Sequence, residues 1–168
     1  DWIELYNDSA ATINLKGFGL SDSIDNPRRF VFANDTLIGS GQYVQVFGED
    51  PGIAGAIIFG FGLGSDGDNV YLFNPAGIEL DGISFGPQPG GLSIGRVDHD
   101  RHWELTTPTP LAINRAAATG DARNLRINEW LASGAMLGDD FVELYNRDKL
   151  PVNLTGLALT DNVIAQPR

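Results

Sequence analysis

Cysteine is absent from this chain of 168 residues, and lysine and arginine are scarce. Without cysteine there can be no disulfide framework, no thiolate zinc site and no cysteine nucleophile, and the usual clue to the redox compartment is missing. Eleven basic residues stand against 22 acidic ones, which leaves a net charge of -11. Because phosphate backbones are bound through Lys and Arg, this balance argues against a nucleic-acid partner. It favours a soluble surface, with affinity for divalent cations as the alternative.

Long hydrophobic runs and helical patterns are also missing. No apolar stretch approaches the roughly 18 residues of a membrane-spanning helix, so we expect no membrane insertion. Only residues 110–118 could carry an apolar stripe of helical spacing. The sequence shows neither a signal peptide nor a starting methionine, so we expect residue 1 not to be the native start.

Short apolar runs separated by turn residues are what the sequence does contain. Its 21 glycines and 9 prolines are scattered between runs of Val, Ile, Leu, Phe and Tyr, which is typical of strands joined by turns. The pattern predicts an all-β fold, and a sandwich is the natural way for many short strands to bury one face. The predicted strands are residues 2–6, 12–15, 17–21, 29–32, 43–47, 57–63, 70–73, 78–85, 93–96, 103–105, 125–132, 141–146 and 157–160.

The stretch WIELYN at the start of the chain alternates in character. Trp2, Glu4 and Tyr6 would share one face of an extended strand, and Ile3 and Leu5 would share the other. Glu4 therefore lies between two aromatic residues. It either faces solvent or accepts hydrogen bonds from neighbouring loop amides, and the sequence leaves both interpretations open.

The same stretch returns near the end of the chain as FVELYN. When residues 1–24 are aligned with residues 140–163 without gaps, ten of the 24 positions are identical and six more differ conservatively. A period of this length is too long for a solenoid repeat and indicates a tandem of whole domains. We therefore expect one domain in residues 1–114, a linker in 115–124 and the opening strands of an incomplete second copy in 125–168.

The order and spacing of several motifs resemble those of bacterial lamin-tail domains, which are immunoglobulin-like β-sandwiches. The motifs are INE (residues 127–129), WIELYN (2–7), INLKGFGLSD (13–22), GQYVQVF (41–47), FGLGSDGDNVYL (61–72), DGISF (81–85), SIGR (93–96) and TPTPLAIN (107–114). Phe18 stands where that family usually has Trp. The resemblance implies the sandwich fold for the first copy and for the incomplete second one.

The resemblance also implies that an opening strand pairs with WIELYN, as residues 125–132 would in the second copy. An upstream segment, a second chain or residues 125–132 folding back could supply that strand to the first copy. Otherwise the first copy would expose an unpaired sheet edge. The predicted assembly edge consists of Trp2, Ile3, Glu4, Leu5, Tyr6, Ile127, Asn128, Glu129, Trp130 and Leu131.

Taken together, these patterns favour a non-enzymatic structural or interaction module. The resemblance places it in a secreted, multi-repeat bacterial protein, at the cell surface or outside the cell, with neighbouring repeats or copies of itself as partners. No G-x-S-x-G frame or dinucleotide-binding loop is present. His99 and His102 could bind a transition metal, but residues three apart on a strand face opposite sides and the chain has no third His, so a solvated loop is the better interpretation.

Two kinds of ligand remain as alternatives. Asp66 and Asp68, like Asp98 and Asp100, alternate in Gly-rich or polar loops as calcium ligands do, although Asp and Gly are also ordinary turn formers. A carbohydrate-binding module attached to an extracellular enzyme is the second alternative, because aromatic faces suit sugar rings. The aromatic candidates are Trp2, Tyr6, Tyr43, Trp103 and Trp130.

Overall fold

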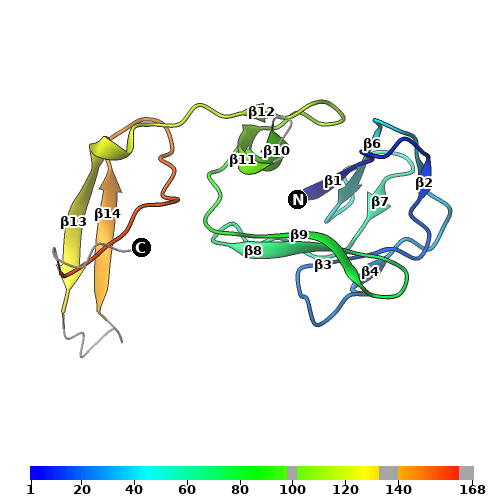
Figure 1. The fold of residues 1–168 in the computed structure, drawn as a ribbon, viewed down its shortest axis with the longest axis horizontal. Coiled ribbons are helices and arrows are strands. Elements are labelled where there is room, and N and C mark those ends of the chain that lie inside the picture. Colours follow the sequence, from blue (N-terminus) through cyan, green and yellow to red (C-terminus); the bar gives the residue numbers. More distant parts are fainter. Residues whose placement is uncertain (98–101, 133–139, 163–168) are drawn as a thin grey trace. The chain divides into compact units, whose positions relative to one another are not determined.

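The computed structural model describes residues 1–97, 102–132 and 140–162, and it divides into two compact units, Asp1–Ala117 and Ala118–Arg168. Strands dominate both units (Figure 1), and the described ranges contain a single helical element, the 3-10 turn η1 (Ala122–Asn124). The strands are β1 (Trp2–Tyr6), β2 (Ile13–Asn14), β3 (Gly19–Ser21), β4 (Phe30–Val31), β5 (Leu37–Ile38), β6 (Tyr43–Phe47), β7 (Ile57–Ile58), β8 (Asp68–Phe73), β9 (Glu79–Phe85), β10 (Ser93–Val97), β11 (His102–Thr107), β12 (Arg115–Ala116), β13 (Leu125–Leu131) and β14 (Phe141–Asn146).

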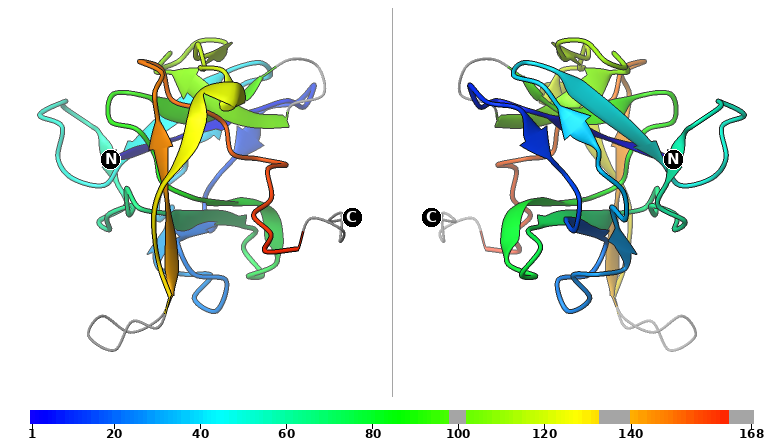
Figure 2. Two further views of the ribbon diagram at one scale, coloured as in Figure 1. Left: turned by 90° about the vertical axis from the view of Figure 1, so that its left-hand side faces the viewer. Right: turned by 90° about the vertical axis from the view of Figure 1, so that its right-hand side faces the viewer.

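The first layer of unit 1 is built around β6. Strand β1 pairs with it antiparallel, from Trp2 opposite Phe47 to Tyr6 opposite Tyr43, and β7 pairs with its other edge in parallel. In Figure 2 the blue β1 and the cyan β6 lie side by side. The predicted alternation of β1 is confirmed at Ile3, which is only 9% exposed and belongs to the hydrophobic core.

The second layer is an antiparallel sheet in the order β4-β3-β8-β9. Its middle strand β3 is fully buried, and together with β1 and β6 it encloses the core of unit 1. This arrangement confirms the prediction of an all-β, immunoglobulin-like sandwich. The core cluster consists of Ile3, Leu15, Leu20, Phe32, Ile38, Val46, Phe59 and Phe61.

A third, smaller sheet in the order β10-β11-β12 completes unit 1, together with the short pair β2-β5. A Cβ at Gly95 on β10 would lie 2.7 Å from the side-chain nitrogen of Asn114, so a larger residue there would displace that amide. The last strand of this sheet lies inside residues 110–118, the one segment whose apolar spacing could also have suited a helix. These residues contain β12, in agreement with the all-β prediction.

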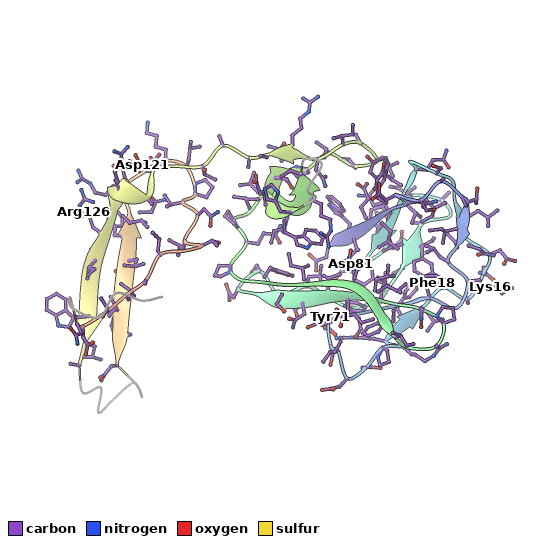
Figure 3. The ribbon with its side chains drawn as sticks, viewed as in Figure 1. Lys16, Phe18, Tyr71, Asp81, Asp121 and Arg126 are labelled. Carbon is purple, nitrogen blue, oxygen red and sulfur yellow. The ribbon has the colours of Figure 1, made fainter. Side chains whose placement is uncertain are left out.

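Unit 2 consists mainly of the antiparallel hairpin pair β13-β14, with a β-bulge between Ile127 and Glu129. Asp121 caps η1 at the start of β13 (Figure 3) by accepting the Arg123 backbone N–H at 2.9 Å. The predicted strand at residues 157–160 does not form. Its counterpart β3 in unit 1 is held between β4 and β8, and the described part of unit 2 contains no equivalents of those two strands.

Hydrogen bonds in the two units recur with the same spacing as the sequence repeat. Asn7 and Asn146 each donate from Nδ2 to the carbonyl four residues later, at 2.8 Å in both cases. Each also accepts the backbone N–H two residues later through Oδ1, at 2.9 Å in both cases. Gly17 and Gly156 both take the left-handed backbone conformation, with φ of 84° and 80°. The repeated sequence therefore repeats its local geometry.

Candidate assembly groove

Strand β1 has one hydrogen-bonded neighbour, β6, and among the residues that the structure describes no strand pairs with its other edge. The same holds for β10, whose neighbour is β11. Unpaired strand edges offer rows of N–H and C=O groups to any further strand. Two such edges border the same hollow in unit 1.

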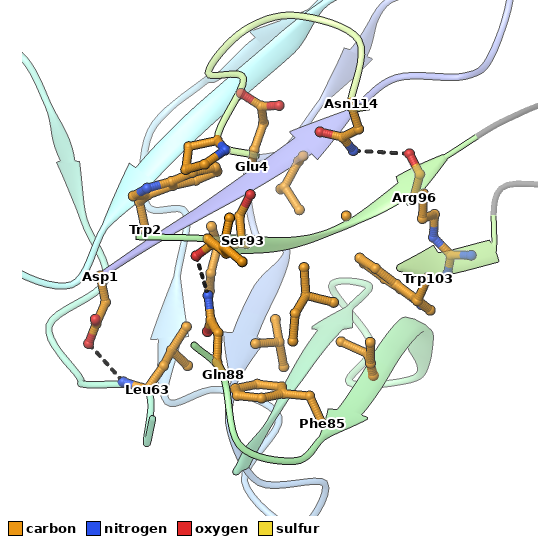
Figure 4. A pocket seen from close by; sticks show the side chains of 18 of the residues that line it. Asp1, Trp2, Glu4, Leu63, Phe85, Gln88, Ser93, Arg96, Trp103 and Asn114 are labelled. Carbon is orange, nitrogen blue, oxygen red and sulfur yellow. Dashed lines mark hydrogen bonds between the residues drawn. The ribbon is translucent and has the colours of Figure 1, made fainter. Parts of the chain in front are cut away.

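That hollow, which we call the β1 groove, has a volume of about 540 Å³. Every residue of β1 lines it, as do four residues of β10 and apolar side chains of β8 and β9 (Figure 4). Its lining therefore includes apolar side chains from both layers of the sandwich. The full lining is residues 1–6, 43, 63, 65, 70, 72, 81, 83, 85, 88–96, 103, 108 and 114.

Side-chain hydrogen bonds hold the loops around the groove. The Asp1 carboxylate accepts the Leu63 backbone N–H at 2.9 Å, and Gln88 Nε2 donates to the Leu92 carbonyl at 2.7 Å. Asn114 Nδ2 donates to the Arg96 carbonyl at 3.0 Å, as the dashed lines of Figure 4 show. The first contact ties a loop to the residue before β1, the second lies within the loop between β9 and β10, and the third ties a loop to β10.

Glu4 is the carboxylate in the middle of the β1 edge. Its Oε2 accepts the backbone N–H of Leu111 at 2.6 Å, which confirms the interpretation that Glu4 ties down a loop amide. Burial raises the pKa of Glu4 above its ordinary value, and the hydrogen bond from Leu111 opposes part of that rise. The side chain is therefore a partly desolvated acceptor at the centre of the groove wall.

Three aromatic residues of the groove, Trp103, Tyr6 and Tyr43, contact neighbours through their rings. The Arg96 guanidinium lies 4.4 Å from the ring centre of Trp103, and its NH2 group contacts the Asp81 carboxylate at 2.6 Å. The rings of Tyr6 and Tyr43 are tilted against each other with centroids 4.8 Å apart. These contacts reduce the open aromatic face that a sugar ring would need.

The match to known families follows from the same strands. Residues 1–87, slightly more than half of the chain, match the model of the Lamin Tail Domain family. The chain belongs to the lamin tail domain family. The match ends just after β9, so β10–β12 and unit 2 lie outside the matched residues. Comparisons with curated proteins and with solved structures returned no match.

The lamin tail domain is a non-catalytic domain, and its sandwich in this chain presents the β1 groove as the candidate site. Within the described residues, no helix has the length and apolar character to cross a membrane. Sequence reasoning placed five of the groove residues on the assembly edge, Trp2 to Tyr6. It missed the β10 residues, because nothing local in SIGRV indicates that they line the same hollow as β1.

Unit 2 shows how a strand of the β1 type is paired on its other edge. There β14, which aligns with β1 of the lamin tail domain, is paired with β13. The Asn128 side-chain amide donates to the Glu143 carboxylate across this pair. Ile127 and Trp130 on β13 remain 59% and 69% exposed. Their apolar surface is therefore left uncovered within the hairpin.

The predicted calcium loops are only partly within the described residues. Asp98 and Asp100 lie outside them. Asp68 uses one carboxylate oxygen to accept the Gly64 N–H and the other to accept the Asn69 N–H, both at 2.8 Å, which is turn chemistry. Asp66 is exposed nearby. In the part of the chain that the structure describes, no group of three or more His, Asp or Glu side chains is arranged around a metal position.

Proposed function

We propose that this chain is a structural and interaction module of a secreted or cell-surface bacterial protein, and that it associates through strand addition at β1. The partner is a neighbouring repeat or another copy of the chain, which supplies a strand of the β13 type to the β1 groove. One observation carries the proposal. Strand β14 is paired with β13, whereas the corresponding edge of β1 has no paired strand among the described residues.

The recurrence of local geometry supports treating β14 as a copy of β1. Asn7 and Asn146 make equivalent hydrogen bonds, and residues 1–24 and 140–163 share ten identities. When the β13-β14 register is transferred to β1, Ile127 stands opposite Leu5 and Trp130 opposite Ile3. These β1 residues face the core, so the incoming Ile and Trp would cover it too.

Burial supplies the driving force for the exchange. An isolated two-stranded hairpin is marginally stable in water, and β13 leaves its two largest apolar side chains mostly exposed in unit 2. In the β1 groove the same side chains would meet Val70, Leu72 and Ile83. At about 25 cal/mol per Å² of apolar surface, covering a Trp and an Ile favours the groove by several kcal/mol before ordering costs are subtracted.

The absence of cysteine allows a direct test by engineered disulfides. Chains carrying Leu5→Cys are mixed with chains carrying Ile127→Cys and oxidised mildly, and the products are separated without reductant. We expect the mixed disulfide dimer to form in preference to the two disulfide homodimers. The reason is that paired residues of antiparallel strands have Cα atoms about 4.5–5.5 Å apart, which a disulfide can span. As the matched control, Tyr6→Cys replaces Leu5→Cys and points to the opposite face. Equal cross-linking by both pairs would refute the proposed register. A complete lack of self-association at millimolar concentration would refute the proposal itself.

Carbohydrate binding is the second candidate, because Trp2, Tyr6, Tyr43 and Trp103 all line the β1 groove. It ranks second because Arg96 covers one face of Trp103 and the two tyrosines pack against each other. A glycan array with the full chain separates the candidates. Binding that is lost in Trp103→Ala and kept in Trp130→Ala would favour the carbohydrate module over strand addition.

A further inference from the structure

One of the two carboxylate oxygens of Glu4, Oε1, can accept a further hydrogen bond at the β1 edge. Leu111 donates to Oε2, and the described residues provide no hydrogen bond to Oε1. The carboxylate is half-buried and its charged form is disfavoured there by burial. A further donor arriving at this position would therefore satisfy a partly desolvated charge, and hydrogen bonds to charged groups are the stronger ones.

Unit 2 shows which donor fits. Glu143 occupies the position of Glu4 in the repeat, and its Oε1 accepts the side-chain amide of Asn128. Asn128 is the extra residue of the β13 bulge, so two residues of β13, Asn128 and Glu129, stand opposite Glu143. Glu129 alone would bring a like charge to this carboxylate, which is unfavourable across a strand pair. The neutral amide beside it supplies the compensating donor.

We propose that Glu4 recognises the bulge asparagine, Asn128, of a β13 strand from a second copy of this chain and so fixes the register of strand addition. The inference rests on the proposed function and adds the residue pair that selects the partner. The docked strand keeps the register seen in unit 2, with the Asn128 amide on the free oxygen of Glu4 and Leu111 still on the other. Strands that lack an amide or another donor at the bulge leave Glu4 desolvated without compensation.

The test is a coupling experiment between peptide and chain. The probes are two fluorescently labelled peptides of residues 125–131, one with the wild-type sequence and one with Asn128→Ala. Each peptide is titrated with the full chain at concentrations below those at which the chain self-associates. We expect the Asn128→Ala peptide to bind about tenfold more weakly, as for loss of one charge-assisted hydrogen bond. On a Glu4→Met chain, which keeps the side-chain length without an acceptor, the two peptides should bind equally. On an otherwise matched Glu49→Met chain, altered at an exposed residue outside the groove, the tenfold preference should persist.

The outcomes separate the inference from the proposed function. The wild-type peptide could bind while the Asn128→Ala peptide binds tenfold more weakly to the Glu4→Met chain as well. Glu4 then does not recognise the asparagine, although strand addition itself is supported. If neither peptide binds the wild-type chain, strand addition by β13 itself is wrong. Should Glu4→Met fail to fold, Glu4→Gln replaces it, since Gln keeps an acceptor. The preference should then fall to about threefold, as expected when a charged acceptor becomes neutral, and an unchanged tenfold preference would overturn the inference.

Discussion

Glu4 and Leu111 are joined by a hydrogen bond of 2.6 Å between positions 107 residues apart in the sequence. Leu111 is the one described residue other than glycine with a positive φ, 58°. A bulky side chain disfavours this left-handed conformation by roughly 1–2 kcal/mol. The contact from Glu4 therefore helps to hold a strained loop against the outer face of β1.

Replacing Glu4 by Gln should raise the melting temperature of the chain at pH 7. Burial is the larger influence on Glu4 and raises its pKa, so ionised Glu4 destabilises the folded state relative to the unfolded chain. Because the folded pKa lies above the unfolded one, the penalty is present at pH values above it and disappears as the pH falls to the ordinary Glu range. The gain from Glu4→Gln should therefore shrink between pH 7 and pH 4, measured by thermal melts with Glu49→Gln as the control. A lower melting temperature of Glu4→Gln at pH 7 would show that the charged bond to Leu111 outweighs burial.

Asn7 should matter far more to stability than its repeat partner Asn146. Asn7 is 2% exposed and also donates to the Ile38 carbonyl at 2.8 Å, which ties β1 to β5. Asn7→Ala leaves buried carbonyls without donors and should lower the free energy of unfolding by about 2–4 kcal/mol. Asn146→Ala in the open hairpin should cost less than about 1 kcal/mol. Denaturant unfolding of the two variants measures the difference, and equal effects would contradict this account of the core.

Removal of calcium should leave the melting temperature unchanged. Both carboxylate oxygens of Asp68 already accept backbone N–H groups of the turn, so the loop does not need an ion to be held. Melts in excess EDTA and in millimolar CaCl2 make the comparison. A rise with calcium that is lost in Asp68→Asn would instead identify this loop as a site, whereas a rise lost in Asp98→Asn would place the site in the other predicted loop.

Asp121 should remain ionised to unusually low pH. The side-chain hydrogen bond from Arg123, together with that residue's backbone N–H, lowers the pKa of Asp121 to about 2. Since the folded pKa is depressed, its contribution to stability is complete above the ordinary Asp range and is lost as the pH falls through about 2. Carbon-detected NMR titration of the carboxyl group tests this. In Arg123→Ala the midpoint should move back toward the ordinary value, and an unmoved midpoint would assign the shift to another cause.

The long strands could be predicted from the sequence because their patterns are complete within five or six residues. The predicted bounds of β1, β6 and β14 are those of the structure. The short strands β5 and β12 could not be predicted, since a two-residue strand is defined by the partner that it meets and not by any alternation of its own. The segment at residues 157–160 shows the converse, a strand-like pattern that has no partner in the described part of unit 2.

The candidate site was predictable along one side only. Repetition of WIELYN predicted that β1 is an edge strand, and it proposed residues 125–132 as the complement, which stays a prediction. The β10 residues of the groove, the Arg96 contact over Trp103 and the role of Leu111 depend on contacts between distant segments. Such contacts follow from how the sheets pack, which a local pattern does not record.

The bulge at Asn128 has a consequence for selectivity among strands. In a regular strand, residues three apart face opposite sides, yet the bulge brings Ile127 and Trp130 to the same side, opposite Leu144 and Val142. A strand with simple alternation covers the same two positions with residues that are two apart, and it places a single residue opposite the carboxylate between them. An unpaired strand edge would ordinarily favour uncontrolled fibre growth. Under the proposed strand addition, the additional residue of the bulge would distinguish β13 from such regular strands.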